Sequence, residues 1–276
     1  MKEKPKVLYH GSKYCFEIVK PHQATRSMDS TRKFDGYAKE YAIGRPSYAL
    51  DLINCLYERY GISEKSVIAD VGSGTGKFAK HLLERGSQVY CVEPNDDMRQ
   101  TAEKELGCYE NFHSVAGNAQ CTNLDDGFVD FVTTAQAFHW FDVSGFKREC
   151  MRIMKKGGRV LLIWNIRDES DVVNQELQEI YLRYCPNFIG FNGGIRKDDR
   201  RIRDFFDDRY DYVSFDHPLS FDKEKFMARS LSGSYSLKAG DKSYEDYLGA
   251  IENIFDRHSK QGMVSVANQS VAYVGE

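Results

Sequence analysis

The segment from Val67 to Phe78 combines one acid with three regularly spaced glycines. It reads VIADVGSGTGKF, in which an apolar run contains Asp70 and is followed by Gly72, Gly74 and Gly76. The apolar run fits a strand covered on both faces. Alternate glycines allow a tight turn against which a ligand can lie without meeting a Cβ. A helix beginning after the last glycine would point its free N–H groups and the positive end of its dipole at that ligand. The segment therefore predicts a ligand-binding strand–turn–helix.

The spacing of these glycines differs from that of the two common phosphate-binding loops. The dinucleotide fingerprint is G-x-G-x-x-G, whereas here an acid precedes three alternate glycines. The carboxylate of Asp70 would repel a pyrophosphate but would suit a cationic or amine-bearing ligand. A Walker loop needs Ser or Thr after its lysine, and here Phe78 follows Lys77. An NAD-linked oxidoreductase is therefore disfavoured, although it stays open as an alternative.

A second acid, Glu93, ends the next predicted strand (87–92), about twenty residues beyond the glycines. An acid at this place can accept hydrogen bonds from both hydroxyls of a ribose. NAD enzymes share the feature, so it indicates a nucleoside without identifying it. The alternative is that Glu93 caps the helix that follows.

Strands and helices must position these residues, and after the glycines they alternate regularly. The pattern predicts helices at 77–85, 96–106 and 144–154, and strands at 112–116, 129–135 and 159–164. Such alternation with short loops is typical of a parallel, doubly wound α/β sheet, which binds ligands at the carboxyl ends of its strands. Asp70, Glu93, Asn118 and Gln136 all fall at or just beyond such ends. We therefore expect them to converge on one crevice.

Two motifs carry a resemblance to a known family. The D-x-G-x-G-x-G segment resembles motif I of the class I S-adenosylmethionine (SAM) dependent methyltransferases. The stretch TAQAFHWFD, from Thr134 to Asp142, resembles the motif after strand four in the trans-aconitate and ubiquinone-biosynthesis branch of that family. The resemblance covers about Phe34 to Gly275. It implies a seven-stranded, mostly parallel Rossmann-like sheet with antiparallel last strands and a helical lid, and methyl transfer that leaves S-adenosylhomocysteine.

The resemblance also implies roles in cofactor binding. In that family the acid at the position of Glu93 binds the SAM ribose, and a residue at the position of Asn118, with the next N–H, reads the adenine edge. An ordinary turn explains Asn118 equally well. Asp70 would orient the amino-acid portion of SAM through the loop or a water. The expected cofactor-binding residues are Tyr37, Arg45, Asp70, Gly72, Ser73, Gly74, Gly76, Glu93, Asn118, Ala119 and Gln136.

Tyr37 and Arg45 precede the glycine-rich segment. An arginine suits the methionine carboxylate of SAM because its planar fork can bond a carboxylate through two N–H groups. The alternative is an aromatic packing face followed by a capping arginine.

On the acceptor side, the resemblance places His139, Trp140 and Tyr235 at the substrate. His139 is the candidate general base, since an imidazole with a pKa of about 6.5 titrates near working pH. A hydroxyl acceptor needs a base and a carboxylate does not. The aromatic side chains around His139 could instead pack against the next helix, and Tyr235 could belong to a flexible loop. The [DN]-P-P-[FY] motif of amino-methylating nucleic-acid enzymes is absent. We expect O-methylation of a small carboxylate or hydroxyl compound.

The chain is expected to divide into four segments. Residues 1–30 form an appendage of unknown role, and residues 31–165 form the SAM-binding core with N-terminal helices. Residues 166–260 form a mostly helical lid, with helices at 172–184, 195–206, 223–231 and 244–258 and a strand at 210–217. Residues 261–276 supply a C-terminal strand that completes the sheet. The lid contains Arg183, Arg196 and Arg229, which could meet an acidic substrate or simply face solvent.

Composition excludes several classes of function. The 276 residues carry a net charge of −3, which gives no support for a nucleic-acid-binding surface. Seven scattered cysteines without a C-x-x-C pair predict no metal site and fit a reducing, cytoplasmic location. No secretory signal or membrane span is predicted, and the sequence does not indicate an oligomeric state. A non-catalytic SAM-binding protein, whose lid admits no substrate, is the remaining alternative.

Overall fold

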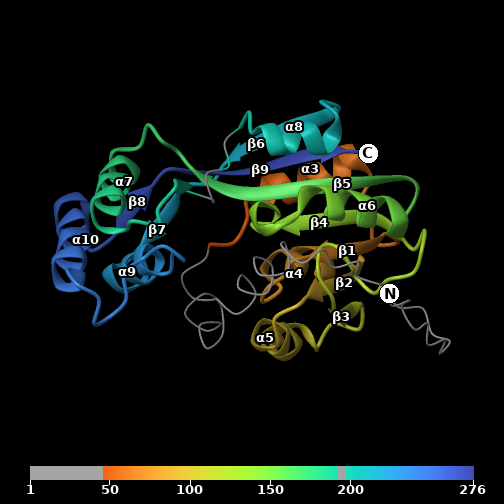
Figure 1. The fold of residues 1–276 in the computed structure, drawn as a ribbon, viewed down its shortest axis with the longest axis horizontal. Helices are drawn as coiled ribbons and strands as arrows, with labels where there is room; N and C mark the ends of the chain where they lie inside the picture. Colours follow the sequence, from red (N-terminus) through yellow and green to blue (C-terminus); the bar gives the residue numbers. More distant parts are fainter. Residues whose placement is uncertain (1–45, 192–194, 196) are drawn as a thin grey trace, which may run out of the picture.

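The computed structural model describes residues 46–276 except 192–194 and 196. Its centre is a seven-stranded sheet with the strand order β3-β2-β1-β4-β5-β9-β6 (Figure 1). The strands are β1 (Val67–Val71), β2 (Gln88–Glu93), β3 (Phe112–Ala116), β4 (Val129–Ala135), β5 (Met154–Arg167), β6 (Tyr210–Asp216) and β9 (Asn268–Gly275). The first five are parallel, and β9 is antiparallel to both of its neighbours. The predicted doubly wound, mostly parallel α/β sheet is confirmed.

Helices cover both faces of this sheet, which is why its central strands consist mainly of buried apolar residues. Successive residues of a strand point to opposite faces. In β1, Ile68 packs with α3 (Leu50–Tyr60) and α4 (Lys77–Leu83), and Ala69 packs with α6 (Val143–Ile153) and α8 (Arg200–Phe206). Both side chains are fully buried. Full burial of the Ile68 side chain contributes about 1.5–3 kcal/mol, so packing against α3 and α4 stabilises the strand that leads into the glycines. The fifth helix in this region, α5 (Asp96–Leu106), packs against β2 and β3.

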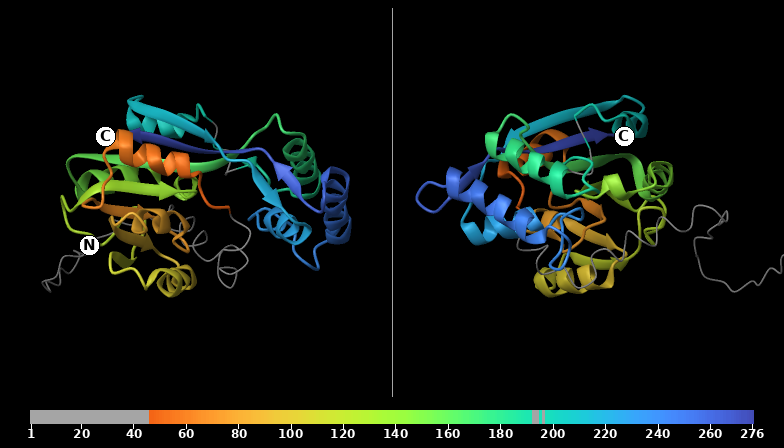
Figure 2. Two further views of the ribbon diagram at one scale, coloured as in Figure 1. Left: turned by 180° about the vertical axis from the view of Figure 1, so that it is seen from behind. Right: turned by 60° about the vertical axis from the view of Figure 1, so that its left-hand side comes forward.

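The fifth strand is longer than the sequence pattern predicts. Residues 159–164 were expected to form it, whereas β5 runs from Met154 to Arg167. Its last residues stay extended because they pair with β9, with Arg167 opposite Asn268. The strand therefore extends beyond the end of β4, still paired with β9, and leads directly into a second group of helices (Figures 1 and 2).

This second group of helices, together with two short strands, is here called the lid and lies beyond the carboxyl end of β5 (Figure 2). It consists of α7 (Val172–Tyr184), β7 (Leu219–Phe221), α9 (Lys223–Leu231), α10 (Tyr244–His258) and β8 (Val264–Val266). The short strands β7 and β8 pair in antiparallel fashion. Tyr181, Phe226 and Tyr247 lie at the centre of its own apolar core.

Two elements of the segment 166–260 belong to the sheet layer instead of the lid. Strand β6 is the edge strand of the main sheet, and α8 packs against α6 through Phe205 and Phe146, whose rings are 5.4 Å apart. Helix α8 also begins later than the expected residue 195. It starts at Arg200, where the side chain of Asp199 accepts a hydrogen bond from the N–H of Arg201. Residues 261–276 likewise divide between β8 in the lid and β9 in the sheet.

The N-terminal appendage, Tyr37 and Arg45 lie outside the described residues. Within the described ranges, no helix is both long and apolar enough to cross a membrane. The same ranges contain no group of three His, Cys, Asp or Glu side chains placed to hold a metal ion.

Candidate cofactor and acceptor site

The glycine loop, residues 72–76, connects β1 to α4 at the carboxyl edge of the sheet. Its glycines all have positive φ angles, +70° at Gly72, +57° at Gly74 and +78° at Gly76. Residues that have a Cβ rarely adopt positive φ angles, so the conformation of the loop itself favours glycine at these three positions. A Cβ on Gly74 would meet nothing within 4 Å. The protein thus leaves open space above the middle of the loop, where a ligand could approach the backbone.

The loop after β4, here called the β4 loop (residues 136–142), lies directly against the glycine loop. A Cβ on Gly72 would come within 2.7 Å of the Cβ of Ala137 and 3.0 Å of the ring of Phe141. The Gly72 N–H also donates to the carbonyl of Val92, at 2.8 Å. The ends of β1, β2 and β4 are therefore joined at one place, as the sequence predicts for parallel strands.

Glu93 connects the end of β2 to the glycine loop. Its Oε2 accepts a hydrogen bond from the Gly74 N–H at 3.0 Å, and its Oε1 accepts one from the Asn95 N–H at 3.0 Å. Burial raises the pKa of this carboxyl, although both N–H groups act to lower it. The N-cap of α5 is Asn95, whose side chain accepts from the Met98 N–H, so Glu93 is not the capping residue. Each carboxylate oxygen keeps a lone pair that could accept a ribose hydroxyl.

Asp70 lies beneath the glycine loop and is fully buried. Its Oδ1 accepts a hydrogen bond from Thr133 Oγ1 at 2.8 Å, and its Oδ2 has no hydrogen-bond partner among the described residues. Burial raises the pKa of this carboxyl to about 7, with the hydrogen bond from Thr133 acting to lower it and the nearby charge of Glu93 acting to raise it. A buried carboxylate oxygen without a donor is costly, so this atom fits a water or a cationic ligand group. The position suits an indirect role through the loop.

Asn118 follows β3 and shapes its own turn. Its side-chain oxygen accepts hydrogen bonds from the N–H groups of Gln120 and Cys121, at 2.9 and 3.0 Å. Ala119, the next residue, is buried. The geometry matches the turn interpretation of Asn118, while contact with an adenine stays a prediction.

Gln136 begins the β4 loop with a φ of +60°, which is uncommon for a residue with a side chain. Its Nε2 donates to the carbonyl of Asn165 at 3.1 Å, which fixes the loop to β5. Its Oε1 is shielded from solvent and has no hydrogen-bond partner in the described part of the chain. Asp70 and Gln136 thus each present an unsatisfied acceptor at the carboxyl edge of the sheet, as a site for a polar ligand would.

His139 lies in a short 3-10 helix, η2 (Phe138–Trp140), within the β4 loop. Phe138 is buried, with its ring edge-to-face against Trp164 at 6.1 Å. Trp140 is 38% exposed and its ring centroid is 5.0 Å from that of His139. The packing interpretation therefore holds for Phe138, and a role of His139 and Trp140 at the acceptor stays a prediction.

Tyr235 belongs to the lid, where its ring lies 4.7 Å from that of Phe188 and 5.0 Å from that of Tyr181. The sequence interpretation did not identify Arg167, whose guanidinium lies 4.4 Å above the ring of Phe191. Its position at the carboxyl end of β5 could have indicated a site residue, but the predicted strand ended at residue 164 and so did not include it.

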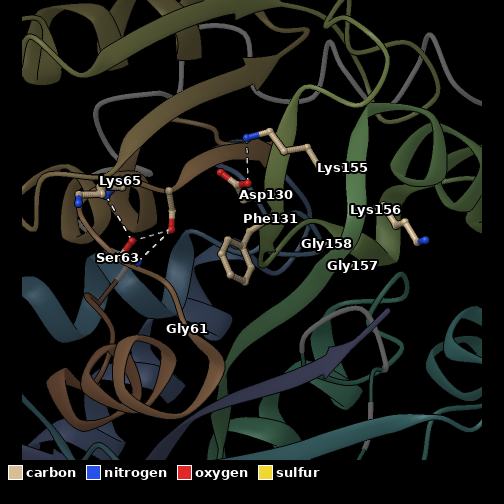
Figure 3. A pocket seen from close by; sticks show the side chains of 10 residues that line it. Gly61, Ser63, Lys65, Asp130, Phe131, Lys155, Lys156, Gly157 and Gly158 are labelled. Carbon is tan, nitrogen blue, oxygen red and sulfur yellow. Dashed lines mark hydrogen bonds and ion pairs between the residues drawn. The ribbon is translucent and has the colours of Figure 1, made fainter.

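A surface hollow lies at the opposite edge of the sheet, beside the amino ends of β1 and β4 (Figure 3). Asp130 lines it, and its carboxylate accepts from the Val67 N–H at 2.8 Å and from Lys155 Nζ at 2.9 Å. The hollow is therefore separate from the glycine loop, and its carboxylate is already satisfied.

Comparison with known proteins agrees with this architecture. Residues 69–162 match the methyltransferase domain family. An uncharacterized methyltransferase-like protein of Schizosaccharomyces pombe is 26% identical over 242 residues, which cover 86% of this chain and 92% of that protein. An uncharacterized methyltransferase of Mycobacterium tuberculosis is 36% identical over 152 residues, 55% of this chain and 60% of that protein, so the match spans under two thirds of this relative.

The fold is also that of solved structures. The structure of a proposed type II methyltransferase from Anaeromyxobacter dehalogenans aligns over 84% of this chain and 97% of its own, with a TM-score of 0.54 and 17% identity. At this identity the likeness concerns the fold alone. The domain match, the named relatives and the fold agree, and residues 69–162 form a methyltransferase domain.

Proposed function

We propose that this protein transfers the methyl group of SAM to a small-molecule acceptor, at a carboxylate or hydroxyl oxygen. The observation that supports this most is the arrangement around Gly74. Its N–H is fixed by Glu93 Oε2 at 3.0 Å, and no protein atom lies within 4 Å of where its Cβ would be. A ribose acceptor and an open stretch of backbone thus lie side by side, as binding of a nucleoside requires.

The described residues fit SAM in their chemistry. Glu93 would accept the ribose hydroxyls, and the glycine loop would lie against the amino-acid portion. The unsatisfied oxygens Asp70 Oδ2 and Gln136 Oε1 suit the donor-rich, cationic end of the molecule. Asn118 and Ala119 follow β3 on the same edge and would border the adenine. Ser73, Gly72 and Gly76 hold the loop in shape, and Tyr37 and Arg45 stay predicted contacts.

When bound, SAM supplies an electrophilic methyl group together with its leaving group. The protein's own contribution is then to place two reactants in line and to keep water out, and good placement can supply about 7–11 kcal/mol of the barrier. A carboxylate acceptor attacks without losing a proton. A hydroxyl acceptor must lose one, and His139 in the β4 loop would take it at a ring nitrogen.

Calorimetric titration with SAM, S-adenosylhomocysteine and NAD tests the cofactor. We expect micromolar binding of the two sulfur nucleosides and no heat with NAD. Glu93→Ala should abolish that binding, because it removes both the ribose acceptor and the bond to Gly74. Glu103→Ala is the matched control on α5, since Glu103 accepts its hydrogen bond from Ser114, away from the loop.

Each contrary result identifies a different alternative. Binding of NAD in place of SAM would overturn the methyltransferase cofactor and favour an oxidoreductase. Tight SAM binding without turnover of any small carboxylate or hydroxyl compound would favour a non-catalytic SAM-binding protein.

A further inference from the structure

Two arginines and four aromatic side chains meet where β5 enters the lid. The aromatic rings contact one another: the ring centroid of Phe188 lies 5.3 Å from Tyr181, 5.4 Å from Phe191 and 4.7 Å from Tyr235. This group, here called the arginine–aromatic cluster, comprises Arg167, Tyr181, Phe188, Phe191, Arg229 and Tyr235.

Arg167 has no anionic partner in this cluster. Its guanidinium lies 4.4 Å from the ring centroid of Phe191, and its Nη1 is shielded from solvent without a hydrogen bond among the described residues. The ion pairs of the described chain do not include it. An arginine is always charged, and leaving a shielded N–H of a charged group unbonded is unfavourable. The fold therefore maintains a cationic donor that a bound anion would satisfy.

A second positive charge reinforces the first. The hydroxyl of Tyr181 donates to the carbonyl of Ser230 at 3.0 Å. Burial raises the pKa of Tyr181, and the charges of both Arg167 and Arg229 act in the opposite direction. The Arg229 guanidinium itself lies 5.1 Å from the ring centroid of Phe221, so the cluster combines two positive charges with aromatic rings.

The cluster is continuous with the cofactor side of the molecule. Gln136 Nε2 donates to the carbonyl of Asn165, in the same strand as Arg167. Two residues along a strand span about 7 Å and return to the same face. A small molecule held at Arg167 could therefore extend back to the β4 loop, where His139 lies. No other charged residue of β5 occupies this end of the strand: the next basic residue along it is Arg159, toward the opposite edge.

We propose that the arginine–aromatic cluster binds the methyl acceptor and that this acceptor is a small organic acid, with a carboxylate anchored by Arg167 and an apolar body against the aromatic rings. The inference rests on the proposed function and adds its substrate class. The anchored carboxylate is not the accepting group, because hydrogen bonds from a guanidinium withdraw electron density from its oxygens. The methyl group goes to a second oxygen nearer the β4 loop.

Binding of simple acids to the full chain saturated with S-adenosylhomocysteine tests this assignment. The probes are glutarate and phenylacetate, each paired with its neutral amide, glutaramide and phenylacetamide, measured by calorimetry. We expect both acids to bind at least about tenfold more tightly than their amides, as a charge-assisted hydrogen bond predicts. Equal binding of acids and amides would overturn the proposal.

Three variants locate the effect. Arg167→Met keeps the apolar length and should weaken binding of the acids by about 10- to 100-fold, with the affinity for S-adenosylhomocysteine unchanged. Arg167→Lys keeps the charge and should recover part of the loss. Arg183→Met is the matched control, because Arg183 is an exposed arginine of α7 whose guanidinium lies 5.3 Å above Tyr184. Acid binding that survives in Arg167→Met, or that falls equally in Arg183→Met, would contradict the assignment.

Thermal unfolding separates a binding role from a structural one. If Arg167 serves to bind a ligand, its unbonded N–H contributes no stability to the fold. Arg167→Met should therefore melt at the same temperature as the wild type or at a higher one. A lowered melting temperature together with unchanged acid binding would show a purely structural arginine. If the wild-type chain did not bind S-adenosylhomocysteine at all, the proposed function itself would fall, and this inference with it.

Discussion

Gly72 and Ala137 lie against each other, so that a Cβ on Gly72 would come within 2.7 Å of the Cβ of Ala137. The two residues belong to different loops, one after β1 and the other after β4. Their contact joins the loop that would bind the cofactor to the loop that carries His139. Crowding and backbone conformation therefore both require glycine at position 72, whereas at position 74 only the conformation does.

Gly72→Ala should destabilise the protein and displace the β4 loop. The substitution adds a clash, which costs about 1–3 kcal/mol in a packed region, to a left-handed conformation that costs roughly 1–2 kcal/mol. Gly61→Ala is the matched control, because Gly61 also has a positive φ, +81°, and nothing lies within 4 Å of its would-be Cβ. Urea unfolding should show the larger loss for Gly72→Ala. Equal losses of unfolding free energy in the two variants would show that the two loops move apart to accommodate the added methyl group.

Gly74→Ala should separate ligand binding from folding. Gly74 and Gly61 share a positive φ and an empty surrounding, so alanine at either should cost a similar roughly 1–2 kcal/mol of unfolding free energy. Only Gly74 lies beside Glu93, at the proposed cofactor position. Calorimetry should therefore show SAM binding lost in Gly74→Ala and retained in Gly61→Ala. Normal SAM affinity in Gly74→Ala would mean that no ligand approaches this part of the loop.

Stability should fall as pH rises toward neutrality because of Asp70. Burial raises the pKa of its carboxyl to about 7 from an ordinary value of 3.8. Between these values the folded state binds more protons than the unfolded state, so the free energy of unfolding decreases with increasing pH. The contribution is fully present below the ordinary pKa and is lost as pH rises through about 7.

Asp70→Asn tests this assignment. An amide oxygen can still accept the hydrogen bond from Thr133, but it does not titrate. Urea midpoints measured from pH 5 to pH 8 should therefore decline more steeply for the wild type than for the variant. Parallel curves would place the raised pKa on another group.

The strand–helix alternation and the convergence of Asp70, Glu93 and Gln136 could be predicted because they depend on local pattern. Helix α5, at Asp96–Leu106, was predicted at its observed bounds for the same reason. Features that depend on distant partners could not be predicted. The burial of Asp70 depends on Thr133, 63 residues away, and the extension of β5 to Arg167 depends on its pairing with Asn268.

The same distinction explains the lid. Residues 166–260 were expected to form a mostly helical lid with a strand at 210–217. The strand is present as β6, but β6 and α8 belong to the main sheet layer, because β6 pairs with β9 and α8 packs against α6. Asn118 is a different case, since both of its interpretations were open at the sequence level. Its hydrogen bonds to Gln120 and Cys121 account for the residue without a ligand.

His139→Ala should reveal whether the acceptor loses a proton. With a hydroxyl acceptor, removal of a general base should lower kcat by about 10²- to 10⁴-fold while the Kd for SAM stays the same. With a carboxylate acceptor kcat should hardly change, because no proton has to be removed. His113→Gln is the control, since His113 lies on β3 and its ring bonds to Gln88 at 2.8 Å, away from the β4 loop. A pH profile of kcat that loses its acidic limb only in His139→Ala would assign the base, and full turnover of a hydroxyl acceptor in that variant would exclude it.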